Sequence, residues 1–204
     1  MLLPINPENP QLRLVRIVVD KLRQGGVIAY PTDTIYGIGC DIFNRKGVKK
    51  IYQIKQRDPR KPFSFICSDL SEVANYAQVS NAAFKIMKRY LPGPYTFVLE
   101  ASRVVPDLLT TKQKTVGIRI PDNQIALQIV RELGHPLVTT SANISGEDNF
   151  SDPVDIQQKL GNMLDLVVDG GSLSGDPSTV ISLVNDQVEV LREGVGDISW
   201  IKQA

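Results

Sequence analysis

Two kinds of hydrophobic pattern alternate along the chain. In 11–24, apolar residues recur at three- and four-residue spacing, which predicts an amphipathic helix that ends at Gly25 and Gly26. The apolar run at 27–30 follows it and predicts a buried strand. By the same criteria, helices are expected at 46–54, in a short segment from 68, at 81–91, at 124–133 and from 153 onward. Strands are expected at 63–67, 95–101, 115–120, 135–141, 165–171, 178–184 and 188–194.

Local signals mark the ends of several of these helices. Ser80 is the expected N-cap of the helix at 81–91, which the Pro-Gly-Pro of 92–94 ends. Asp122 is the expected N-cap of the helix at 124–133, with Gly134 at its C′ position. Asp152 precedes a proline at the favoured first position of a helix.

The order of these elements predicts the fold class. Helices and strands alternate through most of the chain and strands cluster at its end, which indicates an α/β (α+β) protein with a mixed sheet. No repeat, low-complexity segment or linker divides the 204 residues. We therefore expect a single domain over 1–204, with its core at about 12–197.

Composition excludes several classes of protein. Two cysteines, Cys40 and Cys67, are too few for a disulfide scaffold. With a single histidine, the chain also lacks the Cys and His ligands that a structural zinc site normally uses. The N-terminus lacks the charged and apolar regions of a signal peptide, and no apolar stretch is long enough to span a bilayer. The net charge of +1 does not indicate a strongly basic nucleic-acid binder. The expectation is a soluble, cytoplasmic protein without membrane contact.

Short polar clusters follow three of the predicted strands. They are PTDT at 31–34, TTSAN at 139–143 and DGG at 169–171. Such residues can simply form turns, but hydroxyls, amides and glycine-freed backbone N–H groups are also suitable donors to phosphate or carboxylate oxygens. In α/β proteins, ligands gather at strand ends, so three such clusters favour a binding site.

Basic side chains are the second feature expected of a site that binds anions. Lys55 and Arg57 would lie on opposite sides of a helix but on one side of an extended segment, which Asp58-Pro59 favours. Alternation in the strand at 115–120 places Arg119 on the face opposite the apolar residues. A buried arginine must pair with an anion, which can be a carboxylate ligand or a neighbouring Asp or Glu. Arg192 has a comparable setting near the C-terminus.

Other chemistries fit the sequence poorly. There is no GxxxxGK[ST] or GxGxxG phosphate loop, and Ser141 lacks the GxSxG context of a hydrolase nucleophile. His135 precedes a proline and is expected to be a turn residue, and Cys40 a buried structural thiol. Hydroxyls, cations and backbone amides remain, a set that positions anions without forming a covalent intermediate.

Six segments resemble the YrdC-like threonylcarbamoyl-AMP synthase family. In order they are PTDTIYGIGCD, IKQRDPRKP, TVGIRIPDN, TTSANISG, PSTVISL and LREG, and details such as FSFICSDLSE and REGVGD most resemble its YciO branch. The resemblance implies a twisted, open sheet with a large, positively charged, concave cleft. It also implies a reaction that converts ATP, L-threonine and bicarbonate into threonylcarbamoyl-AMP and pyrophosphate, for modification of tRNA.

The resemblance also assigns residues. The positions implied for ATP are Lys55, Arg57, Lys61, Thr115, Ser141, Asn143, Asn149 and Arg192. The positions implied for L-threonine are Thr34, Arg119, Thr139 and Ser178, with Arg119 facing the carboxylate. Mg²⁺ would arrive on the ATP phosphates, without protein side chains as ligands and without a tightly bound organic cofactor. Where many longer synthases carry a histidine, this chain has Ile66 or Cys67.

The resemblance leaves a second interpretation open. Proteins of this family have been associated with tRNA and double-stranded RNA, so the chain could be an RNA-binding accessory protein with little synthase activity. The intact Lys55, Arg57, Ser141 and Asn143 favour nucleotide chemistry, because RNA binding alone would not require them.

Overall fold

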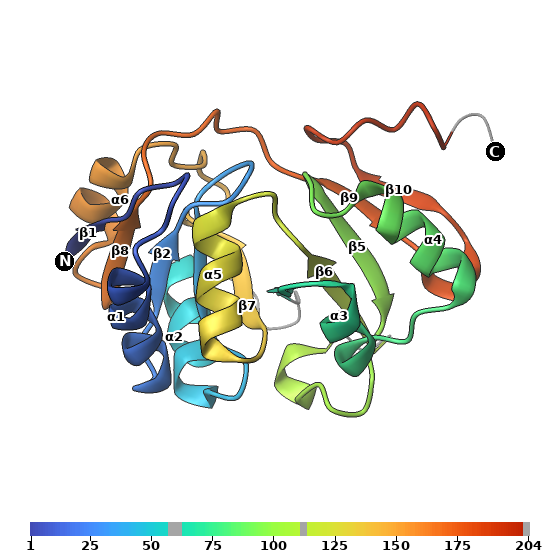
Figure 1. The fold of residues 1–204 in the computed structure, drawn as a ribbon, viewed down its shortest axis with the longest axis horizontal. Coiled ribbons are helices and arrows are strands. Elements are labelled where there is room, and N and C mark those ends of the chain that lie inside the picture. The colour runs from blue at the N-terminus through green and yellow to red at the C-terminus, as the bar shows by residue number, and fades with distance from the viewer. Residues whose placement is uncertain (57–62, 111–113, 202–204) are drawn as a thin grey trace.

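The strands of the described residues form a ten-stranded mixed sheet, which is the framework of the fold (Figure 1). The computed structural model describes residues 1–56, 63–110 and 114–201. The strand order is β1-β8-β2-β3-β7-β4-β6-β5-β9-β10, with parallel and antiparallel neighbours, so the mixed α/β sheet predicted from the sequence is confirmed. The strands are β1 (Leu2–Pro4), β2 (Ile28–Tyr30), β3 (Gly37–Asp41), β4 (Ser64–Ile66), β5 (Tyr95–Glu100), β6 (Thr115–Arg119), β7 (Leu137–Ser141), β8 (Leu166–Asp169), β9 (Thr179–Ser182) and β10 (Glu189–Arg192).

The helices follow the predicted pattern closely. They are α1 (Leu12–Arg23), α2 (Arg45–Lys55), α3 (Leu70–Tyr76), α4 (Asn81–Tyr90), α5 (Gln124–Leu133) and α6 (Pro153–Leu160), with short 3₁₀ turns η1 (Asp107–Leu109) and η2 (Val184–Asp186). Ser80 caps α4 through its side chain, as expected. Helix α6 begins at Pro153, also as expected, and the side chain of Asp152 caps it. Gly134 adopts the left-handed conformation at the end of α5, also as expected.

One predicted cap is wrong. The residue that caps α5 is Asn123, whose side-chain oxygen accepts the backbone N–H of Ala126 at 3.0 Å. Asp122 lies one residue earlier and is exposed. Both residue types cap helices well, so composition alone does not distinguish neighbouring candidates.

Strands β1 and β3 were not predicted. The segment of β3 contains two glycines, which are unfavourable in strands on propensity grounds. The structure explains both of them, because the ring of Tyr30 on β2 lies across β3. A Cβ atom on Gly39 would stand 2.9 Å from that ring and 2.8 Å from the carbonyl oxygen of Val138, and one on Gly37 would stand 3.2 Å from the ring.

The helices cover the two faces of the sheet unevenly. Helices α1 and α5 contact each other and pack on one face, over apolar residues that include Ile66 of β4 and Leu137 of β7 (Figure 1). Residues from α2, α3, α4 and α6 join a second core cluster on the other face. Side chains alternate along a strand, so Ser64 and Thr139 continue the face of Ile66 and Leu137. There the apolar packing ends and a cavity begins.

Candidate functional site

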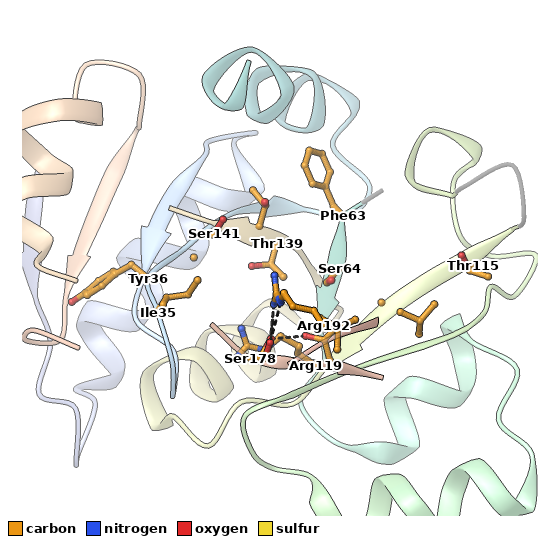
Figure 2. A pocket seen from close by; sticks show the side chains of 16 residues that line it. Ile35, Tyr36, Phe63, Ser64, Thr115, Arg119, Thr139, Ser141, Ser178 and Arg192 are labelled. Carbon is orange, nitrogen blue, oxygen red and sulfur yellow. Dashed lines mark hydrogen bonds between the residues drawn. The ribbon is translucent and has the colours of Figure 1, made fainter. Parts of the chain in front are cut away.

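A cavity of about 280 Å³ lies on this face of the sheet (Figure 2). Among the described residues, its lining comes from seven consecutive strands, β3, β7, β4, β6, β5, β9 and β10, and from residues that precede β3, β4 and β9. On β6 it is the face of Thr115, Gly117 and Arg119 that lines the cavity, as the alternation predicted, while Val116 and Ile118 point into the core. Gly117 keeps the surface low, because a Cβ there would meet the Ser64 hydroxyl at 2.6 Å.

Arg119 has an internal carboxylate partner. Its Nη2 donates to Oδ1 of Asp33 at 2.7 Å and to Oγ1 of Thr34 at 3.0 Å. Of the two partners that the sequence left open, a neighbouring acid is therefore present. Oδ2 of Asp33 and Nε of Arg119 are buried, and within the described ranges they have no hydrogen-bond partner. Arg119 lines the cavity, so N–H groups of its guanidinium that Asp33 and Thr34 do not engage can donate to an oxygen of a ligand.

The PTDT segment is held rigidly around that pair. The Thr32 hydroxyl donates to the carbonyl of Ile35 at 2.6 Å and accepts the backbone N–H of Thr34 at 3.1 Å. The amide of Asn123 donates to the carbonyl of Thr32 at 3.3 Å, which ties the segment to the start of α5. These are the local bonds by which threonine fixes a turn.

Lys55 joins the segment after β7 to the end of α2. Its side chain is buried, and its Nζ donates to the carbonyl oxygen of Ser141 at 2.8 Å, to the Ser141 hydroxyl at 3.2 Å and to Oδ1 of Asn143. The Ser141 hydroxyl also donates to Oδ1 of Asn143 at 2.7 Å. Gln56 then adopts a left-handed conformation and ends the helix. Residues that lie 86 and 88 positions apart thus form one cluster at the β7 end of the cavity.

Arg192 of β10 contributes a second guanidinium group to the cavity. Its Nη2 donates to the carbonyl of Ser178 at 2.8 Å, and the Ser178 hydroxyl pairs with that of Thr96 at 2.9 Å (Figure 2). The register shifts between Val190 and Arg192 on β10, and such irregularities re-aim side chains. Partial burial, and then the charge of Arg119, lower the pKa of the Arg192 guanidinium. Two guanidinium groups therefore act on the same cavity.

The phenol groups of two tyrosines form hydrogen bonds to residues in or next to the cavity. The phenol of Tyr30 lies 2.6 Å from Oγ1 of Thr139, and burial raises the pKa of Tyr30 to about 12. The phenol of Tyr36 donates to the carbonyl of Gly171 at 2.7 Å and accepts the N–H of Gly170 at 3.1 Å. Burial likewise raises the pKa of Tyr36 to about 12. The DGG segment is thus bound to the site through Tyr36.

Comparisons with known proteins assign the chain to a family. A family model that covers the Sua5, YciO and YrdC proteins, described as telomere recombination, matches residues 20–194. The chain belongs to the Sua5/YciO/YrdC family. It is 43% identical to the uncharacterized protein YciO of Escherichia coli over 95% of each chain, and the crystal structure of that protein superposes with a TM-score of 0.94 over 98% of each chain.

Other members of the Sua5/YciO/YrdC family carry names that refer to an activity or a ligand. A putative threonylcarbamoyl-AMP synthase of Methanocaldococcus jannaschii is 36% identical over 92% of this chain and 89% of that protein. The crystal structure of P. abyssi Sua5 complexed with L-threonine has a TM-score of 0.93 at 29% identity, and covers all of this chain and 60% of that one. The resemblance to this family and to its YciO branch is therefore confirmed.

The structure of this family member gathers most of the residues proposed for the site. Six of them line the cavity: Thr115, Arg119, Thr139, Ser141, Ser178 and Arg192. Three more stand behind it, with Thr34 bonded to Arg119, and Lys55 and Asn143 bonded to Ser141. Asn149 is half-buried in the following loop and is not among the described lining residues. Arg57 and Lys61 lie outside the described residues.

Some residues of the site were not predicted. Ser64, Thr96, Val98 and Val180 line the cavity because they alternate with core residues on β4, β5 and β9. The alternation that singled out Arg119 would have found them, once the strands were known to be neighbours. Ile66 and Cys67 are fully buried in the apolar clusters, which explains why no polar side chain occupies these positions.

The remaining candidate groups have structural roles. His135 lies in the bend between α5 and β7, as expected, with Nε2 at 3.6 Å from Oδ2 of Asp41. Burial raises the pKa of the Cys40 and Cys67 thiols, which suits structural cysteines. Within the described ranges, no group of three or more His, Cys, Asp or Glu side chains could hold a metal ion. No helix in those ranges is long and apolar enough to cross a membrane.

Proposed function

We propose that the protein condenses L-threonine, bicarbonate and ATP into threonylcarbamoyl-AMP and pyrophosphate. The observation that carries this proposal is the set of donors around one cavity: the Ser141 hydroxyl, which Lys55 and Asn143 contact, and the guanidinium groups of Arg119 and Arg192. The names of the M. jannaschii relative and of the Sua5 complex support it. The product would serve the modification of tRNA.

The size of the cavity suits a small-molecule site. Its volume of about 280 Å³ lies near the lower end of the usual range for such sites, and strands on both sides of Arg119 contribute to its lining. Binding to the RNA backbone would not require a cavity, so this feature favours the reaction over the RNA-binding alternative.

The proposed chemistry requires binding and orientation more than acid–base catalysis. Bicarbonate and the threonine amine lose water and form a carbamate, whose oxygen attacks the α-phosphorus of ATP while the bond to pyrophosphate breaks. The carbamate is already anionic, so it needs no general base. Ser141, which the ammonium of Lys55 holds in place, would face the phosphates, and Arg119 would face the amino-acid carboxylate. Such fixed donors stabilise the charge that develops. Mg²⁺ would enter on the ATP phosphates and neutralise part of their charge.

Pyrophosphate release from Mg-ATP tests the proposal. We expect release that depends on both L-threonine and bicarbonate, and that is lost in Arg119→Met. Arg131→Met is the matched control, because Arg131 is exposed in the last turn of α5, away from the cavity. Release that is the same without threonine would contradict the synthase function. In that case RNA binding that weakens as salt rises would support the alternative.

A further inference from the structure

Tyr30 lies behind the cavity and does not line it, yet it touches a residue that does. Its side chain is fully buried on β2, with the ring over the two glycines of β3. The phenol reaches past β3 to Oγ1 of Thr139 on β7, at 2.6 Å. Thr139 lines the cavity. Tyr30 can therefore act on a bound ligand only through Thr139.

The direction of this hydrogen bond follows from the environment of the phenol. In the part of the chain that the structure describes, Thr139 Oγ1 is the one hydrogen-bond partner of the phenol. A buried O–H without an acceptor is costly, so the phenolic proton must point at Thr139. A phenol is also more acidic than an aliphatic hydroxyl, and so is the better donor of the two. Tyr30 therefore donates and Thr139 accepts.

This direction fixes what Thr139 can offer to a ligand. Its oxygen is engaged by the phenol, and among the described residues its own proton has no acceptor, so that proton is free to point into the cavity. We propose that Tyr30 is a positioning residue that makes Thr139 a hydrogen-bond donor to a carboxylate oxygen of the amino-acid substrate. The identity of that substrate rests on the proposed function. Arg119, two strands further along the sheet, would donate to the same carboxylate.

Steady-state kinetics of two single variants and of the double variant test whether Tyr30 acts on the substrate through Thr139. Tyr30→Phe keeps the ring over the glycines and removes the phenolic oxygen, and we expect it to raise KM for L-threonine about five- to tenfold, the effect of one hydrogen bond, with KM for ATP unchanged. Thr139→Val should have at least the same effect. The double variant should match Thr139→Val alone, because Tyr30 acts through Thr139. Additive effects, or an unchanged KM in Tyr30→Phe, would overturn the proposal.

Tyr76→Phe is the matched control for the kinetics. It removes a largely buried phenol from the core cluster on the opposite face of the sheet, so it should leave KM for L-threonine unchanged. A comparable rise in KM in this variant would mean that losing any buried phenol is enough, and would overturn the specific role of Tyr30.

NMR of the protein without ligands tests the hydrogen bond independently of any activity. We expect a slowly exchanging Tyr30 hydroxyl proton with a cross-peak to the Thr139 methyl group, absent in Tyr30→Phe. A slowly exchanging Thr139 hydroxyl proton that is donated to the phenolic oxygen of Tyr30 would show the reverse polarity and overturn the inference. If the wild type shows no threonine-dependent pyrophosphate release, the proposed function fails, while this measurement still decides the polarity of the Tyr30–Thr139 bond.

Discussion

Arg119 and Asp33 form an ion pair of 2.7 Å at the edge of the cavity, and each side chain is only 9% exposed. The pair holds one side of the guanidinium in place and balances its charge. It also joins β6 to the PTDT segment, which lies 86 residues away in sequence. A donor that has been fixed before the ligand arrives loses little freedom on binding.

Removing Asp33 should therefore be costly. A buried ion pair that loses one partner leaves an uncompensated charge, so we expect Asp33→Ala to lower the free energy of unfolding by about 3 kcal/mol. Urea denaturation measures the change. The double variant Asp33→Ala/Arg119→Met should recover part of the loss, because it removes the unpaired charge as well. A loss under about 0.5 kcal/mol in Asp33→Ala, the size of an ordinary surface effect, would contradict a buried pair.

Lys55 should matter more than its neighbours on α2. Lys55→Met keeps the buried stem but removes the ammonium that holds Ser141 and Asn143. We expect the affinity for Mg-ATP to fall by about tenfold or more, the usual effect of a lost charge-assisted hydrogen bond. Calorimetric titration with Mg-ATP measures it. Lys50→Met is the control on the same helix, because the pair of Lys50 with Asp165 is more than a third exposed and contributes little. Equal losses in the two variants would argue against a role of the cluster.

The N-terminus of α5 offers a comparison of adjacent residues. Asn123→Ala removes the cap of α5 and the bond to Thr32, so we expect it to lower the free energy of unfolding by about 1 kcal/mol or more. Asp122→Ala should change it by less than about 0.5 kcal/mol, since Asp122 is exposed. Thermal or urea unfolding of both variants decides between them. The reverse order would restore the original prediction that Asp122 is the cap.

Alkaline pH should destabilise the fold. Burial raises the pKa of Tyr30 and Tyr36 from 10.0 to about 12, and raises the pKa of the Cys40 and Cys67 thiols above their ordinary 9.0. Groups whose pKa is raised in the folded state stabilise it below their unfolded pKa, and this stabilisation is lost as pH rises toward the folded value. The free energy of unfolding should thus fall from about pH 9 and continue to fall through about pH 12.

Urea unfolding at a series of pH values follows this loss, and the ultraviolet absorbance of tyrosinate follows the phenols. In Tyr30→Phe, the free energy of unfolding should fall less steeply above pH 10, because the variant lacks one of the two phenols whose pKa is raised to about 12. A flat profile over this range would mean that these groups are solvated in the folded protein.

The sequence predicted what depends on local pattern. Most helices and strands, the cap at Ser80 and the orientation of Arg119 follow from periodicity within one segment. The partners of Arg119 and Lys55 depend instead on which strands become neighbours, and this is decided by contacts between residues more than 80 positions apart. Strand β3 was missed for a related reason, since the ring that explains its glycines belongs to β2.

The position of β10 has a consequence for how the cavity can open. Among the described strands, β10 pairs only with β9, and the register of that pairing shifts just before Arg192. The other walls belong to strands with neighbours on both sides. An edge strand opens locally at a smaller free-energy cost than a central one, so we expect the Arg192 side of the cavity to be the part of this sheet that opens first.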